Sequence, residues 1–287
     1  MGTILVTGAT GTVGTQLVKQ LQAQKADFKA LVHTPGKAKS LQEAGIVVVT
    51  GDFDKPETLE AALQGISKVF LLSSPDQRQA ELQGSVVKAA KKGGVKHIVK
   101  LAALGTSPKS PVSLLRKHAE TEKEIAASGM AYTFLRPHFF MQNSLMFAGT
   151  VAKAGAFYGS MKDAKISLVD VRDVAAVAAA TLTQEGHENK AYDITGPEAL
   201  SFHDLAEVLS KVTGKKVTYV DVPLEETKKG MVAMGFPQWL AEGLAELYKW
   251  FSEGHAAQVT KVVAEVAKKK PYTFEEFVRE YAPAFKG

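Results

Sequence analysis

The sequence of 287 residues contains no cysteine. Without thiols the chain has no disulfide bond, no cysteine nucleophile and no zinc site built on thiolates. This absence is compatible with a reducing compartment, and we expect no metal site elsewhere in the chain. Reactive groups therefore have to be sought among other side chains.

Arginine is scarce among the basic residues. Of 35 lysines and arginines only five are arginine, which leaves 30 lysines, and the formal net charge is +5. The planar guanidinium groups that read bases and phosphates are therefore rare. Because the lysines are scattered along the chain, we interpret them as a solvated surface and expect no nucleic-acid partner.

Long apolar runs are also missing. No segment approaches the length that spans a bilayer, and the chain enters an apolar strand at once, without a basic and then apolar leader. We therefore expect a cytoplasmic protein with no membrane partner. With 45% hydrophobic residues the chain can still bury a full core.

Short apolar runs alternate with amphipathic helical patterns in the first half of the chain. Strands are predicted near residues 3–7, 28–33, 46–50, 67–72, 96–101 and 131–136, and helices begin near 14, 36, 56, 76 and 113. This alternation is typical of a parallel sheet covered by helices on both faces. The prediction is an α/β fold with a Rossmann-type doubly wound parallel sheet, whose ligands bind at the carboxyl ends of the strands.

The pattern becomes irregular after residue 137. The sequence predicts a strand at 165–169, a helix from 171, a strand near 191–194, a helix capped by Ser201 and several helices rich in aromatic residues. We predict two domains. A nucleotide-binding domain comprises 1–137 with 164–196, and a smaller, mostly helical substrate lobe comprises 138–163 with 197–287.

Three glycines follow the first predicted strand. Gly8, Gly11 and Gly14 form a GxxGxxG pattern between an apolar run and an amphipathic helix, whose N-terminus favours an anion. Gly8 permits a tight turn, Gly11 lets the backbone approach a phosphate, and Gly14 lets the helix pack closely. A purely structural turn would contain the same glycines, but this context favours a dinucleotide site. The expected contacts of this segment also include Thr10, Thr12 and Val13.

The end of the second predicted strand indicates which dinucleotide binds. Enzymes specific for NAD usually place Asp or Glu there, whereas this strand ends at His33 and is followed by Lys37 and Lys39. A cation near the strand end favours the 2′-phosphate of NADP. We therefore predict NADP(H), with Lys37 on the phosphate and His33 on the phosphate or the adenine. The alternative is that both lysines only belong to an exposed helix start.

Four further strand ends supply expected cofactor contacts. Asp52 and Phe53 follow the third strand and are placed to meet the adenine. Residues after the next three strands are expected nearer the nicotinamide, namely Ser73, Ser74, Pro75, Ala102 and Pro137.

Six short segments carry a resemblance to a known family. They are residues 6–11, 51–54, 94–99, 132–137, 170–175 and 195–197, which together extend over nearly the whole chain. In these segments the chain resembles the NmrA-like atypical short-chain dehydrogenases/reductases. Residues 185–190, Glu-Gly-His-Glu-Asn-Lys, are similar to the branch of triphenylmethane reductases and NAD(P)H quinone oxidoreductases. The resemblance implies dependence on NADP(H), although the family also contains redox-sensing regulators without known turnover.

The catalytic pair of classical short-chain dehydrogenases is missing from the expected helix. Carbonyl-reducing members use Tyr-x-x-x-Lys, in which tyrosine protonates the alkoxide and lysine lowers the tyrosine pKa. Here Leu114 and His118 stand in those positions. One literal match exists at Tyr158 and Lys162, but it lies beside a glycine directly before a strand, so we predict a turn. If that pair were catalytic, the substrates would be alcohols and ketones.

His118 and Glu122 are the candidate catalytic residues. They are four positions apart and therefore neighbours on a helix, on a face that they share with apolar Leu114 and Ile125. Our hypothesis is that Glu122 orients His118, which bonds the cofactor ribose or supplies a proton. The alternative is a buried pair that only stabilises the helix.

The expected substrate pocket follows the sixth strand. Segment 136–143 mixes flat apolar side chains with hydrogen-bonding groups, a composition suited to a small planar aromatic substrate. A packed hinge between lobes would have the same composition. The candidate substrate-binding residues are Phe139, Phe140, Asn143, Tyr158 and Trp239.

These observations predict an NADPH-dependent reductase that transfers hydride to a conjugated planar acceptor, such as a quinone or a triphenylmethane dye. Such acceptors delocalise the charge that the hydride brings, so a dedicated tyrosine acid is less necessary. The alternative is a non-catalytic regulator that senses NADP(H). A homodimer is compatible with the sequence.

Overall fold

A computed structural model describes residues 2–34, 36 and 38–287 of the chain. The strands are β1 (Thr3–Val6), β2 (Phe28–Val32), β3 (Val47–Thr50), β4 (Ile66–Leu71), β5 (His97–Leu101), β6 (Ala131–Pro137), β7 (Ala156–Gly159), β8 (Lys165–Ile166), β9 (Lys190–Ile194), β10 (Leu200–Ser201) and β11 (Thr218–Asp221). The helices are α1 (Thr12–Ala23), α2 (Lys39–Glu43), α3 (Pro56–Ala62), α4 (Gln79–Lys92), α5 (Ser113–Ala127), the 3-10 helix η2 (Met141–Phe147), α6 (Ala148–Ala154), α7 (Val171–Thr183), α8 (Phe202–Thr213), α9 (Leu224–Ala233), α10 (Gln238–Ser252), α11 (Val262–Val266), α12 (Phe274–Glu280) and α13 (Ala282–Lys286).

The chain divides into two compact units. The first unit comprises Met1–Pro108, Leu115–Arg136 and Val171–Asp193, and the second comprises Lys109–Leu114, Pro137–Asp170 and Ile194–Gly287. These bounds differ from the predicted domains chiefly at 109–114 and 164–170, which both belong to the second unit. Each unit has a hydrophobic cluster of its own.

The first unit is built on a seven-stranded sheet with the order β3-β2-β1-β4-β5-β6-β9. The pairings that join β1 to β2 and β4, β2 to β3, and β5 to β4 and β6 are all parallel. The strand order reverses between β1 and β4, and such a reversal opens a crevice at the carboxyl ends of the two strands. The predicted doubly wound α/β fold is therefore confirmed.

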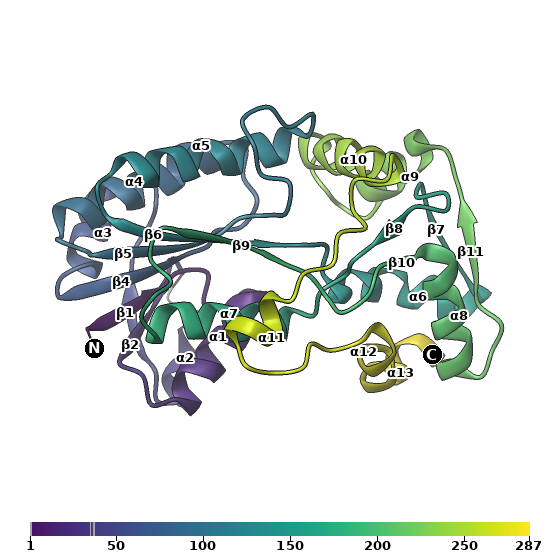
Figure 1. Ribbon diagram of the computed structural model, residues 1–287, viewed down its shortest axis with the longest axis horizontal. Helices are drawn as coiled ribbons and strands as arrows, with labels where there is room; N and C mark the ends of the chain where they lie inside the picture. The colour runs from purple at the N-terminus through teal and green to yellow at the C-terminus, as the bar shows by residue number, and fades with distance from the viewer. Residues whose placement is uncertain (1, 35, 37) are drawn as a thin grey trace. The chain divides into compact units, whose positions relative to one another are not determined.

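Helices cover both faces of this sheet (Figure 1). Helices α3, α4 and α5 lie on one face and α1, α2 and α7 on the other, with α1 packed on α7 and α3 on α4. Because both faces are covered, the central strands are rich in apolar residues, although β5 also contains the buried His97 and Lys100. Leu5, Val69 and Ile98, on three neighbouring strands, are completely buried.

The second unit contains two small sheets and a helical layer. Strand β11 pairs with β7 in parallel, and β10 pairs with β8 antiparallel. The strand predicted at 165–169 is shorter than expected, because only β8 forms a ladder and Val169 makes an isolated bridge to Phe140. Helix α8 begins directly after its N-cap Ser201, as predicted, and Ser201 and Asp204 form a reciprocal capping box.

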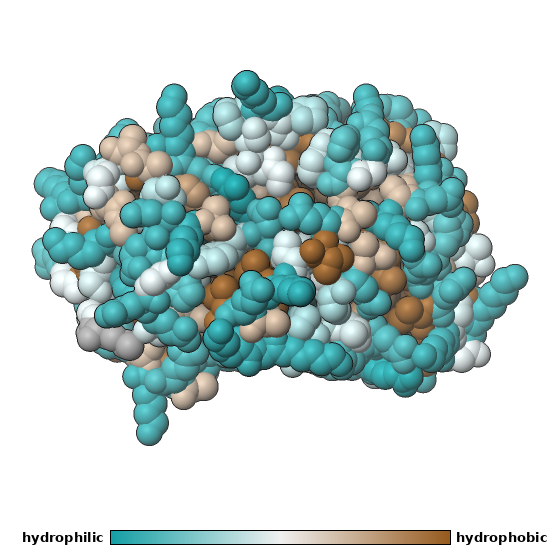
Figure 2. Space-filling model, in the orientation of Figure 1, coloured by the Kyte–Doolittle hydropathy of each residue, from teal (hydrophilic) through white to brown (hydrophobic). Residues whose placement is uncertain are grey.

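The surface is dominated by hydrophilic side chains on the face shown in Figure 2, where hydrophobic residues form separate patches. In the described residues, no helix combines the length and the apolar character that crossing a bilayer requires.

Candidate functional site

The turn after β1 has the backbone that its glycines predict. Gly8 has a φ of +63°, in the left-handed region that favours glycine. The Thr7 hydroxyl accepts the N–H of Leu72 and donates to its carbonyl, both at 2.8 Å, and so joins the ends of β1 and β4. A Cβ at position 14 would lie 2.0 Å from the carbonyl oxygen of Gly8. Helix α1 therefore starts directly against the turn, and only glycine fits at its third residue.

The N-terminus of α1 faces this turn without a side-chain cap. Its N-cap is Gly11, and none of the described side chains bonds the first N–H groups of Thr12, Val13 and Gly14. Such N–H groups, together with the helix dipole, bind phosphate groups. The local structure therefore offers an anion site made of backbone alone.

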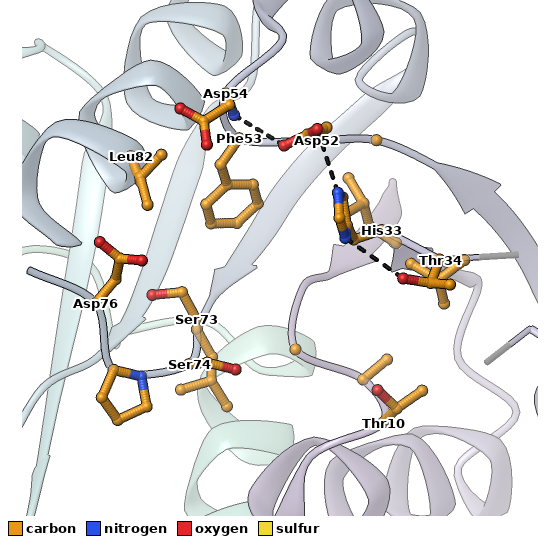
Figure 3. A pocket seen from close by; sticks show the side chains of 17 residues that line it. Thr10, His33, Thr34, Asp52, Phe53, Asp54, Ser73, Ser74, Asp76 and Leu82 are labelled. Atoms are coloured by element: carbon orange, nitrogen blue, oxygen red, sulfur yellow. Dashed lines mark hydrogen bonds and ion pairs between the residues drawn. The ribbon is translucent and has the colours of Figure 1, made fainter. Parts of the chain in front are cut away.

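A cleft of about 400 Å³ opens at the carboxyl ends of β1 to β4. It brings together eight of the predicted cofactor residues: Gly8, Thr10, His33, Asp52, Phe53, Ser73, Ser74 and Pro75. Figure 3 shows His33 and Asp52 joined at one side of this cleft, with Ser73, Ser74 and Asp76 across from them. The cleft therefore forms where the strand order predicts a ligand.

His33 and Asp52 form a polar edge of the cleft. The Nε2 of His33 lies 3.2 Å from Oδ2 of Asp52, and the N–H of Asp54 donates to Oδ1 at 3.0 Å. The Asp54 hydrogen bond, followed by the charge of His33, lowers the pKa of the Asp52 carboxyl. An ionised carboxylate there can accept hydrogen bonds from a ribose or an adenine amino group. Lys37, the predicted phosphate contact, lies outside the described residues.

Ser73 is fixed by the helix that follows its loop. The side-chain amide of Gln83 in α4 donates to the Ser73 hydroxyl at 2.8 Å. Gln83 is 1% exposed, and its Oε1 has no partner among the described residues. The buried side-chain amide of Gln83 therefore fixes the loop that follows β4.

His118 lies in a polar cluster at the carboxyl end of β5. The Nζ of Lys100 is 3.1 Å and the Nε2 of Gln79 is 3.3 Å from the Nδ1 of His118. Burial, followed by the charge of Lys100, holds the pKa of His118 well below its usual value. His118 is therefore neutral, with Nδ1 as the acceptor and the proton on Nε2.

Glu122 does not orient His118, and that part of the hypothesis is wrong. Its carboxylate accepts two hydrogen bonds from Arg136 of β6, including one from Nε at 3.0 Å. A planar guanidinium matches a carboxylate in this two-point geometry better than an imidazole does. The buried Glu122 therefore ties α5 to β6, and Lys100 and Gln79 orient His118 instead.

Lys100 is a site residue that sequence reasoning missed. It is completely buried, and its Nζ also donates to the carbonyl of Leu101 at 3.1 Å. Burial lowers the pKa of Lys100 to about 7, although the charge of Glu122 acts in the opposite direction. The signal available in the sequence was a lysine near the carboxyl end of a predicted strand, where ligands bind.

Two other predicted cofactor residues lie apart from the cleft lining. Ala102 is buried, and its N–H donates to the carbonyl of Leu135 at 2.7 Å, which extends the pairing of β5 with β6. Pro137 belongs to the second unit.

The predicted substrate residues all belong to the second unit. Phe139 packs edge-on against Tyr248 and Phe251, with ring centroids 5.9 and 6.0 Å apart. Phe140, Asn143 and Trp239 are half-buried. Phe139 is therefore packed against two aromatic rings of α10.

The literal Tyr-x-x-x-Lys match has no helical geometry. Tyr158 lies on β7 and is 49% exposed, whereas Lys162 follows in a turn with a φ of +47°. The segment is not helical, as expected, but within the pair the predicted turn is limited to Lys162, because Tyr158 belongs to β7. The pair therefore lacks the i, i+4 placement on a helix that the classical mechanism uses.

Comparison with known proteins identifies similar chains over nearly the whole length. The model of the NmrA-like family matches residues 1–278. An NAD(P)H azoreductase of Xenophilus azovorans is 43% identical over 282 residues, which are 98% of this chain and 99% of that protein. Quinone oxidoreductase 2 of Escherichia coli is 34% identical over 278 residues, covering 96% of this chain and 97% of that protein.

Solved structures show the same fold. The NADPH complex of a quinone oxidoreductase from Escherichia coli has a TM-score of 0.90 at 33% identity, over 97% of this chain and 99% of that one. The NADP(H) complex of a triphenylmethane reductase from Citrobacter has a TM-score of 0.88 at 32% identity, over 96% of this chain and 99% of that one.

Proposed function

Because the chain belongs to the NmrA-like family, we propose that it is an NADPH-dependent reductase of conjugated planar acceptors: azo compounds, quinones or triphenylmethane dyes. The chain is an NAD(P)H-dependent oxidoreductase, as the azoreductase and quinone oxidoreductase that it matches end to end indicate. The observation that carries the cofactor assignment is the contact of Gly14 with the Gly8 carbonyl, beside an open cleft at the reversal of the strand order.

The residues of the first unit fit a dinucleotide. The backbone of the Gly8 turn and the N-terminus of α1 suit the pyrophosphate, because the first N–H groups of α1 have no side-chain cap and Gly11 and Gly14 let the turn and the helix approach closely. His33, Asp52 and Phe53 suit the adenosine end, and Ser73 and Ser74 suit the nicotinamide end. NADP(H) is the cofactor of the structural relatives and the one that we assign here. When bound, NADPH supplies a hydride.

The side chains of α5 suit an acceptor that needs little acid catalysis. Helix α5 has Leu114 and His118 in the positions of the classical pair, and His118 is neutral with its proton on Nε2. A neutral imidazole N–H can donate a hydrogen bond or a proton but cannot protonate an alkoxide as strongly as an imidazolium. This arrangement supports acceptors that delocalise the incoming charge.

The test is oxidation of NADPH by the purified protein, followed optically with azo dyes, quinones and triphenylmethane dyes. NADH is run in parallel, and a reaction without protein measures direct chemical reduction. We expect saturable turnover that prefers NADPH, and its loss in Gly14→Ala but not in Gly149→Ala, where a Cβ would meet open space. Tight nucleotide binding without turnover of any acceptor would replace the reductase with a sensing regulator.

A further inference from the structure

The proposed function leaves Lys100 without a role. We propose that Lys100 supplies protons to His118, so that His118 can protonate acceptors that take up a proton together with the hydride, such as azo compounds. This inference rests on the proposed reductase function. In this proposal Lys100 positions His118 and supplies it with protons, and His118 contacts the acceptor and donates a proton to it.

Lys100 is buried in a way that packing alone does not explain. It has no exposed surface, and in the described part of the chain its Nζ bonds the Leu101 carbonyl and the Nδ1 of His118. Neither partner carries a negative charge, and the nearby carboxylate of Glu122 is bound by Arg136. A buried ammonium without an ion pair is costly, and an apolar side chain would fill the same space more favourably.

The hydrogen bonds define which nitrogen of His118 is free to act. Lys100 and Gln79 both approach Nδ1, at 3.1 and 3.3 Å. Nε2 therefore carries the proton. Nε2 has no protein partner among the described residues, and His118 is only half-buried.

The cluster is attached to the loop that lines the cleft. Lys117, next to His118, donates through Nζ to the carbonyl of Gln77 at 2.9 Å. Gln79 follows on the same segment and bonds His118 itself. Because this segment continues directly from Ser73 and Ser74, which line the cleft, the cluster is anchored beside the expected nicotinamide end.

The proposed step balances in protons and electrons. A hydride adds to one nitrogen of an azo group, and the N=N bond becomes N–N with a negative charge on the other nitrogen. The Nε2–H of His118 transfers its proton to that nitrogen, while the Lys100 ammonium transfers a proton to Nδ1. The product is a hydrazo compound, His118 is left as its other neutral tautomer, and Lys100 is left as a neutral amine that regains a proton from water.

The charged surroundings suit such a donor. From α5, His118 and Glu122 face Lys100, and from β6 Arg136 neutralises Glu122. The side chain that α4 contributes is the neutral amide of Gln79. With a pKa of about 7, Lys100 can both give and regain a proton near neutral pH.

The structure predicts a difference between two classes of acceptor. A cationic triphenylmethane dye accepts hydride at its central carbon and becomes neutral, so it needs no proton. An azo dye needs one proton for each hydride.

We therefore compare Lys100→Met with the control variant Lys68→Met. Lys68 is a half-buried lysine toward the opposite end of the neighbouring strand β4, and its Nζ donates to the Leu182 carbonyl.

The measurement is kcat for an azo dye and for a cationic dye that stays unhydrated over the pH range, with each variant and NADPH. In Lys100→Met we expect the ratio of azo to cationic-dye turnover to fall about 100-fold, the usual range for losing a proton donor. Lys68→Met should keep the original ratio. In the unaltered protein, azo turnover should fall as pH rises through about 7, while cationic-dye turnover should not. An equal loss for both dyes would overturn the proposal, because a merely structural lysine affects both reactions.

A second readout needs no turnover. In the nucleotide-free protein, folding lowers the pKa of Lys100 from 10.5 to about 7, so between these values the unfolded chain binds the extra proton. The stability of the unaltered protein relative to Lys100→Met should therefore rise with pH above 7. A constant difference in Tm between the two proteins from about pH 6 to pH 9 would overturn the proposal. Failure of the reductase itself would instead appear as no turnover of either dye with a normal Tm profile.

Discussion

Gly14 is a residue at which the backbone leaves no room for a side chain. A Cβ there would lie 2.0 Å from the Gly8 carbonyl oxygen and 2.8 Å from the Ala9 Cα, and neither backbone atom can move as a flexible side chain can. We expect Gly14→Ala to displace the turn, to weaken NADPH binding beyond detection and to lower the free energy of unfolding by about 1–3 kcal/mol. Chemical denaturation and fluorescence titration with NADPH check both effects. Unchanged NADPH affinity would contradict the assignment of the turn.

We expect His33 to help distinguish NADPH from NADH. It is 71% exposed at the cleft edge and is held by Asp52 and Thr34. We expect His33→Ala to raise the Kd for NADPH about fivefold, which corresponds to about 1 kcal/mol for one hydrogen bond. The Kd for NADH should change less. His203→Ala, at an exposed histidine of the second unit paired with Asp163, is the control, and equal losses for both nucleotides would argue against a 2′-phosphate contact.

Local patterns identified some site residues and could not identify others. The glycines and the strand-end residues of the cleft could be identified because each directly follows a predicted strand, and ligands bind at the carboxyl ends of such strands. The partner of Glu122 did not, because Arg136 lies 14 positions away and only the pairing of the sheet brings it to α5. A sequence shows which residues are neighbours on one helix, but it does not show which of two side chains a carboxylate will contact.

Helix α8 illustrates how a single cap sets the start of an element. The Ser201 hydroxyl accepts the N–H of Asp204 at 3.1 Å, and the Asp204 carboxylate accepts the N–H of Ser201 at 2.8 Å. We expect Ser201→Ala to cost about 1 kcal/mol of stability, and Ser201→Asn to restore most of it. Thermal unfolding of both variants checks this. A loss that Asn does not restore would show that Ser201 acts through packing.

Element boundaries were predictable where they carry local signals. The helix that follows Ser201 has a capping box, and most strands of the central sheet are short, mainly apolar runs. The segment 165–169 reads as one apolar strand, but only its first two residues find a ladder partner, in β10. The length of a strand depends on how many residues of a neighbouring strand are available to pair with it, and the sequence of the strand alone does not show this.

The whole molecule has two compact units with separate cores, and the cleft belongs to the first unit. A ligand that binds only the folded state stabilises it, by about 2.7 kcal/mol at a concentration 100 times its Kd. We expect NADP⁺ at that excess to raise the midpoint of the far-UV circular dichroism transition by about 5–10 °C. Gly14→Ala should show no such shift.

Both tryptophans, Trp239 and Trp250, belong to the second unit, so tryptophan fluorescence reports the unfolding of the second unit separately. No shift in the unaltered protein would contradict nucleotide binding.

The sequence by itself determined the fold class, the glycine turn and the cofactor, because each depends on residues that are consecutive or on a regular period along the chain. The alternation of apolar runs with helices predicts the parallel sheet, and the three glycines predict the anion site at its edge. Only the tertiary structure decided that Lys100 holds His118 and that Arg136 holds Glu122. The physical reason is that hydrogen bonds between elements depend on sheet order and helix placement, which bring together side chains that the sequence keeps apart.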